Sequence, residues 1–118
     1  MTATVRIYGY AGLTTAHLVA GGSSRPTSDS LSMLQNPYLG GEVLTADNVT
    51  PVTSSVNTAP AKTTLLQVQV QPGKSIYYEV TPENLDTLRV ATTSSPIIRG
   101  DTLLNFRAGW RLSVLEAV

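Results

Sequence analysis

The chain has 118 residues, with eight basic and eight acidic side chains and a formal net charge of zero. Charged residues make up 14% of it, against roughly a quarter in an ordinary globular domain, and it has one histidine and no cysteine. This composition excludes disulfides and thiol chemistry, gives no basic excess for nucleic acid, and leaves little for acid–base or metal chemistry. The hydrophobic fraction of 42% suffices for a core, so we expect one β-rich domain spanning residues 1–118.

The first predicted elements are two β-strands. Residues 2–8 alternate between apolar and polar side chains, which predicts a half-buried strand with Ala3, Val5 and Ile7 on its inner face. Residues 14–20 predict a second strand. The Gly, Ser, Arg and Pro residues at 21–26 then end any regular element.

Residues 27–37 are the best helix candidate. A Thr-Ser pair provides an N-cap, two leucines lie three residues apart, and an Asn-Pro pair ends the segment. At about two turns, such a helix is stable only if it docks on a sheet. Residues 42–45 then predict a short strand.

Residues 46–63 are rich in Thr, Ser, Val and Pro and show no sustained period. The β-branched residues favour extended backbone, while the prolines forbid a central position in a sheet. Together with the residues before them they make 21–63 an unusually long, poorly patterned tract for one compact domain. We therefore expect this tract to be either flexible or an arm that another surface orders.

The C-terminal half carries the clearest strand pattern. Residues 65–70 alternate apolar residues with glutamines, Pro72-Gly73 fits the centre of a type II turn, and 75–80 resume the alternation. We predict that these two runs pair as a hairpin.

Three further regions follow this hairpin. Residues 86–92 predict a strand with Leu88 and Val90 inward, 96–99 and 102–106 flank a Gly-Asp turn, and an alternating run begins at Trp110. Turn signals about every ten residues predict an all-β fold, a small antiparallel β-sandwich or barrel. We expect it to carry a long extended loop or arm and at most one short helix.

No group of residues predicts catalysis. His17 lacks the partners of a metal or catalytic motif, so we interpret it as a packing residue. The carboxylates Glu79, Glu83, Asp86 and Asp101 lie at predicted solvent-facing or turn positions, so we do not interpret them as a catalytic pair. Arg99-Gly100-Asp101 spells an integrin-binding tripeptide, but a turn already explains its Gly-Asp. We therefore predict a protein that is not an enzyme, with no catalytic residue, metal or cofactor.

Four residues are candidates for an interface. Tyr77 is expected to face away from Ile76 and Tyr78, where an exposed aromatic ring would anchor a partner. Arg99, Arg107 and Arg111 cluster in the sequence and either bridge to a neighbouring subunit or solvate the sheet edge.

The composition resembles that of small accessory structural proteins of tailed bacteriophages, especially head decoration or cement proteins. The stretches that carry this resemblance are 46–64 as a candidate arm and 65–116 as a β body. Proteins of that class tend to be small β-sandwiches or barrels that bind the outer shell where capsomers meet, often as trimers.

The resemblance implies a virion protein, assembled in the host cytoplasm, that stabilises the shell by binding the major capsid protein or other virion proteins. It also implies a homo-oligomer, with a trimer as one option. The lack of a basic excess argues against a nucleic-acid partner, and the longest uncharged stretch, residues 7–24, is too polar for a membrane span, so we expect no membrane partner. Two alternatives stay open, a phage neck, tail or baseplate component and a carbohydrate-binding β-sandwich module.

Overall fold

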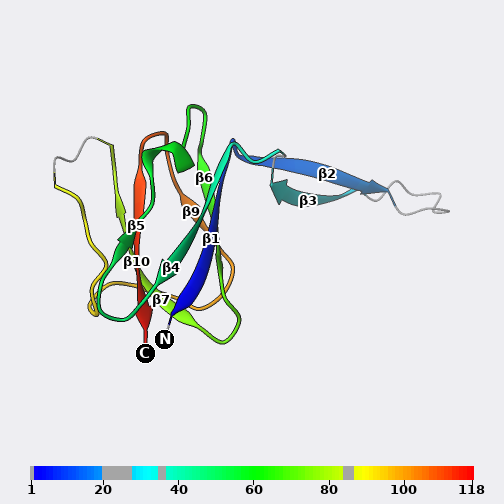
Figure 1. Cartoon of the computed structure of the whole chain (residues 1–118). Coiled ribbons are helices and arrows are strands. Elements are labelled where there is room, and N and C mark those ends of the chain that lie inside the picture. Colours follow the sequence, from blue (N-terminus) through cyan, green and yellow to red (C-terminus); the bar gives the residue numbers. More distant parts are fainter. Residues whose placement is uncertain (1, 20–27, 35–36, 84–86) are drawn as a thin grey trace.

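The computed structural model describes residues 2–19, 28–34, 37–83 and 87–118, and of 14–19 and 28–33 it describes only the backbone. The described chain is nearly all β-structure, with two antiparallel sheets of four strands each. The sheets face each other across one core, and a separate two-stranded ribbon extends to one side (Figure 1). The predicted all-β sandwich is therefore confirmed.

The first sheet has the strand order β4-β1-β6-β9. Its strands are β1 (Ala3–Tyr10), β4 (Gly40–Ala46), β6 (Leu65–Val70) and β9 (Thr102–Asn105). The second sheet has the order β5-β10-β7-β8. Its strands are β5 (Val52–Thr53), β7 (Ser75–Thr81), β8 (Ile97–Ile98) and β10 (Arg111–Ala117), and a short 3-10 helix, η1 (Val56–Thr58), follows β5.

The core lies between the two sheets and follows the predicted alternation. Fully buried side chains from the first sheet meet fully buried side chains from the second. The ring of Phe106, which follows β9, is also fully buried and meets the ring of Trp110 edge to face, with ring centroids 5.9 Å apart. The largest members of this core are Val5, Ile7, Leu66, Val68, Ile76, Phe106, Leu112 and Val114.

The predicted hairpin of residues 65–80 is wrong in its pairing, although its turn is present. Gly73 has a φ of 79°, and Lys74 N donates to Gln71 O at 3.0 Å, as a type II turn requires. However, β6 pairs with β1 and β9, whereas β7 pairs with β10 and β8. The turn therefore carries the chain across the core, from one sheet to the other.

The helix predicted at 27–37 is also wrong. Residues Ser28–Leu34 form strand β3, which pairs along its whole length with β2 (Leu13–Val19). The segment contains three serines and an aspartate, whose side chains compete for backbone hydrogen bonds and disfavour helix interiors. Pairing with β2 satisfies the backbone groups that a two-turn helix would leave open. Residues 35–36, at the predicted end of this helix, lie outside the described residues.

The strand predicted at 86–92 is absent from its described part, residues 87–92. Val90 is 46% exposed rather than inward, while Ala91 is buried. This segment lies against the outer face of the second sheet, where Ala91 N donates to Ser113 Oγ at 2.9 Å. Its backbone is satisfied by side chains of the sheet instead of by a neighbouring strand.

Residues 46–63 lie against the sandwich. Ser54 is buried and joined to Leu112 by two hydrogen bonds, from Ser54 N to Leu112 O and from Leu112 N to Ser54 Oγ, both 2.8 Å. The Glu42 carboxylate on β4 accepts hydrogen bonds from Ser55 N at 2.8 Å and Thr58 Oγ1 at 2.7 Å. The element that projects from the domain is instead the β2–β3 ribbon, which includes part of the tract 21–63.

Candidate interaction surfaces

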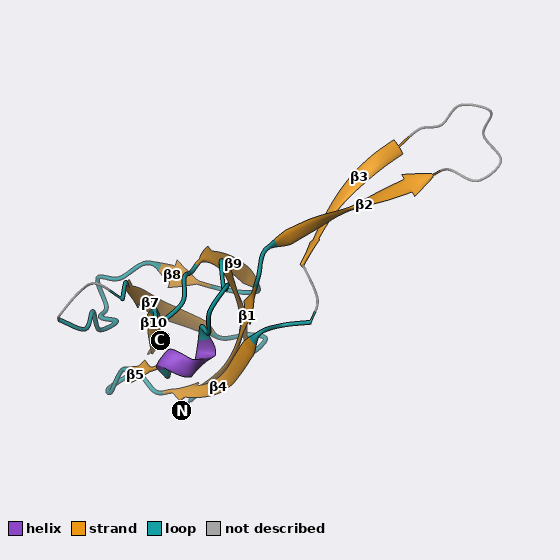
Figure 2. Cartoon of the chain, turned by 90° about the horizontal axis from the view of Figure 1, so that it is seen from above, coloured by secondary structure: helices purple, strands orange, loops and turns teal. Residues whose placement is uncertain are grey.

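The β2–β3 ribbon is the most prominent feature of the outer shape. Its seven antiparallel residue pairs run from Leu13–Leu34 to Val19–Ser28. Figure 2 shows that the ribbon leaves the sandwich and extends away from both sheets, giving the molecule extents of 59 × 32 × 21 Å. His17 lies within it, opposite Ser30 in the register. At its base, Leu13 is 52% exposed.

Three tyrosines gather near the base of the ribbon. Tyr38 is 54% exposed, and its ring centroid lies 5.1 Å from that of Tyr8 and 6.5 Å from that of Tyr10. The chain is fixed here because Leu39 N donates to Gly9 O at 2.6 Å. An exposed ring held by two neighbouring rings is a ready contact for a partner with an apolar face.

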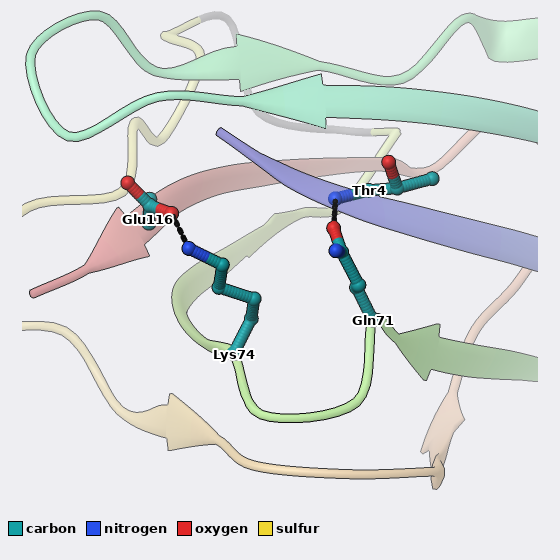
Figure 3. A network of polar contacts seen from close by, with 4 residues as sticks. All are labelled: Thr4, Gln71, Lys74 and Glu116. Carbon is teal, nitrogen blue, oxygen red and sulfur yellow. Dashed lines mark hydrogen bonds and ion pairs between the residues drawn. The ribbon is translucent and has the colours of Figure 1, made fainter. Parts of the chain in front are cut away.

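Polar side chains cover the outer face of β1 and β6. The register places Thr4, Arg6 and Tyr8 of β1 beside Gln71, Gln69 and Gln67 of β6, and we call these six residues the glutamine face. Two of its amides are held by their oxygens, since Gln71 Oε1 accepts from Thr4 N at 3.1 Å (Figure 3) and Gln67 Oε1 from Tyr10 Oη at 3.3 Å.

A hollow of about 510 Å³ lies at one end of this face. It is lined by Thr4, Arg6, Gln69, Val70, Gln71, Pro72 and Asp101. Among the described residues, neither the Arg6 guanidinium nor the Asp101 carboxylate forms an ion pair or a side-chain hydrogen bond. The hollow therefore offers a cation, an anion and two amides whose outward groups have no partner within the described part of the chain.

The outer face of the second sheet is largely covered. Ser95 Oγ donates to Glu79 Oε2 at 2.7 Å, and Arg89 N donates to Thr81 Oγ1 at 2.8 Å. Thr81, Ser113 and Leu115 are buried although they point away from the core. Tyr77 shares this face, paired in register with Leu115 and Ile97, and it is half-buried.

The three predicted interface arginines do not form one cluster. Arg99 precedes β9 and Arg107 follows it, so the two lie at opposite ends of that strand. Arg107 Nη1 donates to Thr64 O at 2.7 Å and to Asn105 Oδ1 at 2.6 Å, which occupies it within the chain. Arg111 is half-buried at the start of β10, opposite Thr81, and Arg99 is exposed.

A buried carboxylate closes the end of the core near both termini. Glu116 on β10 is 3% exposed, and its Oε2 lies 3.4 Å from Lys74 Nζ (Figure 3). Neither Glu116 oxygen accepts a hydrogen bond from the described residues. A hollow of about 340 Å³ lies beside this pair and is lined in part by Asn48 and Ser75.

Asp47, the residue that follows β4, caps the next loop. The Thr50 and Val49 N–H groups donate to Asp47 Oδ1 at 2.6 and 2.9 Å. These hydrogen bonds lower the pKa of Asp47 because they stabilise its charged form. This arrangement is a local turn rather than a site.

Sequence reasoning identified the outward glutamines but missed the face they form. The signal was the alternation Gln67, Gln69 and Gln71, yet their neighbours Arg6 and Tyr8 are about sixty residues earlier in the chain. Only the β1–β6 pairing brings the two groups together.

No family model, curated protein or solved structure matches the chain. In the described part of the chain, no group of three or more His, Cys, Asp or Glu residues is placed to hold a metal ion. None of the helices in that part is long and apolar enough to cross a membrane.

Proposed function

We propose that this protein is a non-enzymatic structural component of a virion, a capsid decoration or cement protein that stabilises the shell by binding the major capsid protein. The observation that carries the proposal is the β2–β3 ribbon, which extends away from a small sandwich. In this proposal, the ribbon binds the surface of the shell at a seam between capsid subunits.

The low stability expected of an isolated ribbon favours attachment to a surface. A two-stranded hairpin alone in water is marginally stable at best, because ordering its backbone costs more than its few cross-strand contacts return. A surface that adds strands to its edges or packs on its faces supplies the missing stabilisation. The exposed Leu13, Tyr38 and Leu39 at its base extend the apolar area available to such a surface.

Oligomerisation would strengthen this attachment. A homo-oligomer presents several ribbons at once, so binding of the first raises the effective concentration of the others. A protein of zero net charge has little electrostatic repulsion to oppose such self-association. Light scattering of the purified protein measures the oligomer directly.

The test compares the full chain with a variant in which residues 13–34 are replaced by a short Gly-Ser loop. Each is mixed with shells assembled from the co-encoded major capsid protein, sedimented, and imaged by electron microscopy. We expect the full chain to saturate the shells at a fixed ratio, and the variant to stay in the supernatant with its far-UV dichroism and cooperative unfolding retained. Val90→Ser, an exposed position on the sandwich, is the control and should bind as the wild type does.

Two results would reject the proposal. If the full chain does not bind shells, the decoration function is wrong; labelling of the neck or tail in whole virions would support the alternative location in a neck, tail or baseplate. If the variant lacking the ribbon binds as tightly as the full chain, the ribbon is not the attachment.

A further inference from the structure

We infer that the glutamine face and its hollow form a binding site for a neutral saccharide. The inference rests on the outer face of β1 and β6 and does not depend on the ribbon or on the virion assignment. It would give the protein a second activity, the attachment of a glycan on the side of the sandwich not covered by residues 87–95.

The amides of the glutamine face have hydrogen-bonding capacity that the described residues do not use. Gln71 and Gln67 are held through their side-chain oxygens, and their Nε2 groups have no acceptor among the described residues. Gln69 lies between them with no side-chain hydrogen bond to that part of the chain. Residues on one face of a strand repeat about every 7 Å, so the three amides form a regular row of polar groups.

The lining of the hollow includes one basic and one acidic side chain. Arg6 offers several donors in one plane and Asp101 offers acceptors, and together they add no net charge. The neighbouring hydroxyls of a sugar are both donors and acceptors, so a sugar can satisfy both groups at once. A phosphate or a nucleic acid would satisfy Arg6 and be repelled by Asp101.

Tyrosine rings lie farther along the same face of β1, beyond the hollow. Tyr8 is the next residue after Arg6 on the same face of β1, and its ring packs against the exposed ring of Tyr38. Sugar rings carry an apolar C–H face that packs on aromatic rings, while their hydroxyls need polar partners. A row of amides that leads from a polar hollow to tyrosine rings therefore provides both kinds of contact.

The size of the site agrees with this ligand. A hollow of about 510 Å³ lies within the range of small-molecule sites, and it is partly open to the surface. An oligosaccharide that extends from the hollow toward Tyr38 follows the strand direction. Peptides that bind β-sandwiches by strand addition use a sheet edge, whereas β1 and β6 are the central strands of their sheet.

The test begins with a printed array of plant, animal and bacterial glycans, followed by nuclear magnetic resonance titration. The titration uses the array hit together with maltohexaose, cellohexaose and chitohexaose. We expect saturable shifts in the side-chain amide signals of Gln67, Gln69 and Gln71 and in the ring signals of Tyr38. Shifts of these signals with at least one probe are the supporting result.

Substitutions locate the site. Arg6→Ala should weaken binding about tenfold or more, because hydrogen bonds to a charged group contribute at least this much. Tyr38→Ala should also weaken it. Arg89→Ala is the matched control, since Arg89 is likewise exposed but lies over the second sheet, and it should bind as the wild type does.

The inference is overturned if the array is blank and no probe shifts the amide signals. It is also overturned if Arg6→Ala and Arg89→Ala bind a glycan equally, because binding then occurs elsewhere. If only capsid shells, and no glycan, broaden the signals of this face, it is a protein contact and the saccharide assignment is wrong.

Discussion

Replacing Lys74 with methionine removes the only charged partner that the described residues give to the buried Glu116 carboxylate. Glu116 is 3% exposed and neither of its oxygens accepts a hydrogen bond from those residues, so the ammonium group 3.4 Å away is its main compensation. Methionine retains most of the apolar stem of lysine. The change therefore isolates the loss of charge from the loss of packing.

The magnitude follows from the burial of the two groups. Breaking a fully buried ion pair costs about 3–5 kcal/mol, because the remaining charge is left without compensation. Lys74 is 24% exposed, so part of its interaction is screened by water, and we expect Lys74→Met to lower the free energy of unfolding by about 2–3 kcal/mol. For a domain of this size that corresponds to roughly 10 °C in Tm.

Substitution of the other member of the ion pair should behave differently. Glu116→Leu removes the buried carboxylate and leaves Lys74 free to turn toward water, so we expect a change within about 1 kcal/mol. The double variant should then match Glu116→Leu, which gives a coupling energy of about 2 kcal/mol in a double-mutant cycle.

Urea unfolding at neutral pH, followed by the single tryptophan, measures all four proteins. The slope of the free energy against urea should stay constant, since the native fold is unchanged. The reasoning is refuted if Lys74→Met lies within about 0.5 kcal/mol of the wild type, or if Glu116→Leu is destabilised as much as Lys74→Met.

Three further predictions concern packing, the core and pH. Gly40→Ala would place its Cβ 2.8 Å from Thr58 O and should lower the free energy of thermal unfolding by about 1–3 kcal/mol. In the control Gly100→Ala, the added Cβ meets nothing within 4 Å, so this change should be near neutral. Equal Tm values for the two variants would contradict this prediction. Phe106→Ala empties a fully buried site and should lower the free energy of unfolding by about 3–5 kcal/mol, with a red shift of tryptophan emission. A loss of stability below about 1 kcal/mol would contradict this prediction and show that the surrounding core collapses into the site. The lowered pKa of Asp47 contributes stability that is present above the pKa of the unfolded chain and is lost as pH falls through the pKa of the folded protein. Asp47→Asn should therefore destabilise the protein less at acidic pH than at neutral pH. A titration by nuclear magnetic resonance that gives Asp47 the usual aspartate pKa or a higher one would disprove the role of its two backbone hydrogen bonds.

The strands of the sandwich were largely readable from alternation, but their partners were not. The run from Leu66 to Val80 has inward apolar residues on both sides of a well-formed turn, which fits a hairpin and a crossing between sheets equally well. In both arrangements the same side chains reach the core. Only the competing partners β1 and β10, which are distant in the sequence, decide between them.

The errors at 27–37 and 86–92 have a similar origin. In β3, pairing with β2 overrode a weak local helix signal. In the second segment, Ser113 and Thr81 accept the backbone hydrogen bonds of Ala91 and Arg89, so the chain needs no strand partner there. The glutamine face was beyond local patterning for the same reason, since it joins two strands about sixty residues apart.

The order of the strands also determines when the sandwich can form during synthesis. β10 pairs with both β5 and β7, so β5 cannot join β7 and β8 in the second sheet until residues 111–117 have left the ribosome. β1 must wait for β4 and β6, which are synthesised much later than β1 itself. Such non-local pairing makes folding slow, on the order of milliseconds to seconds. The β2–β3 ribbon joins neighbouring segments of the chain, so a surface that stabilises it can bind it while the sandwich is still open. Such a surface meets a domain that is not yet closed.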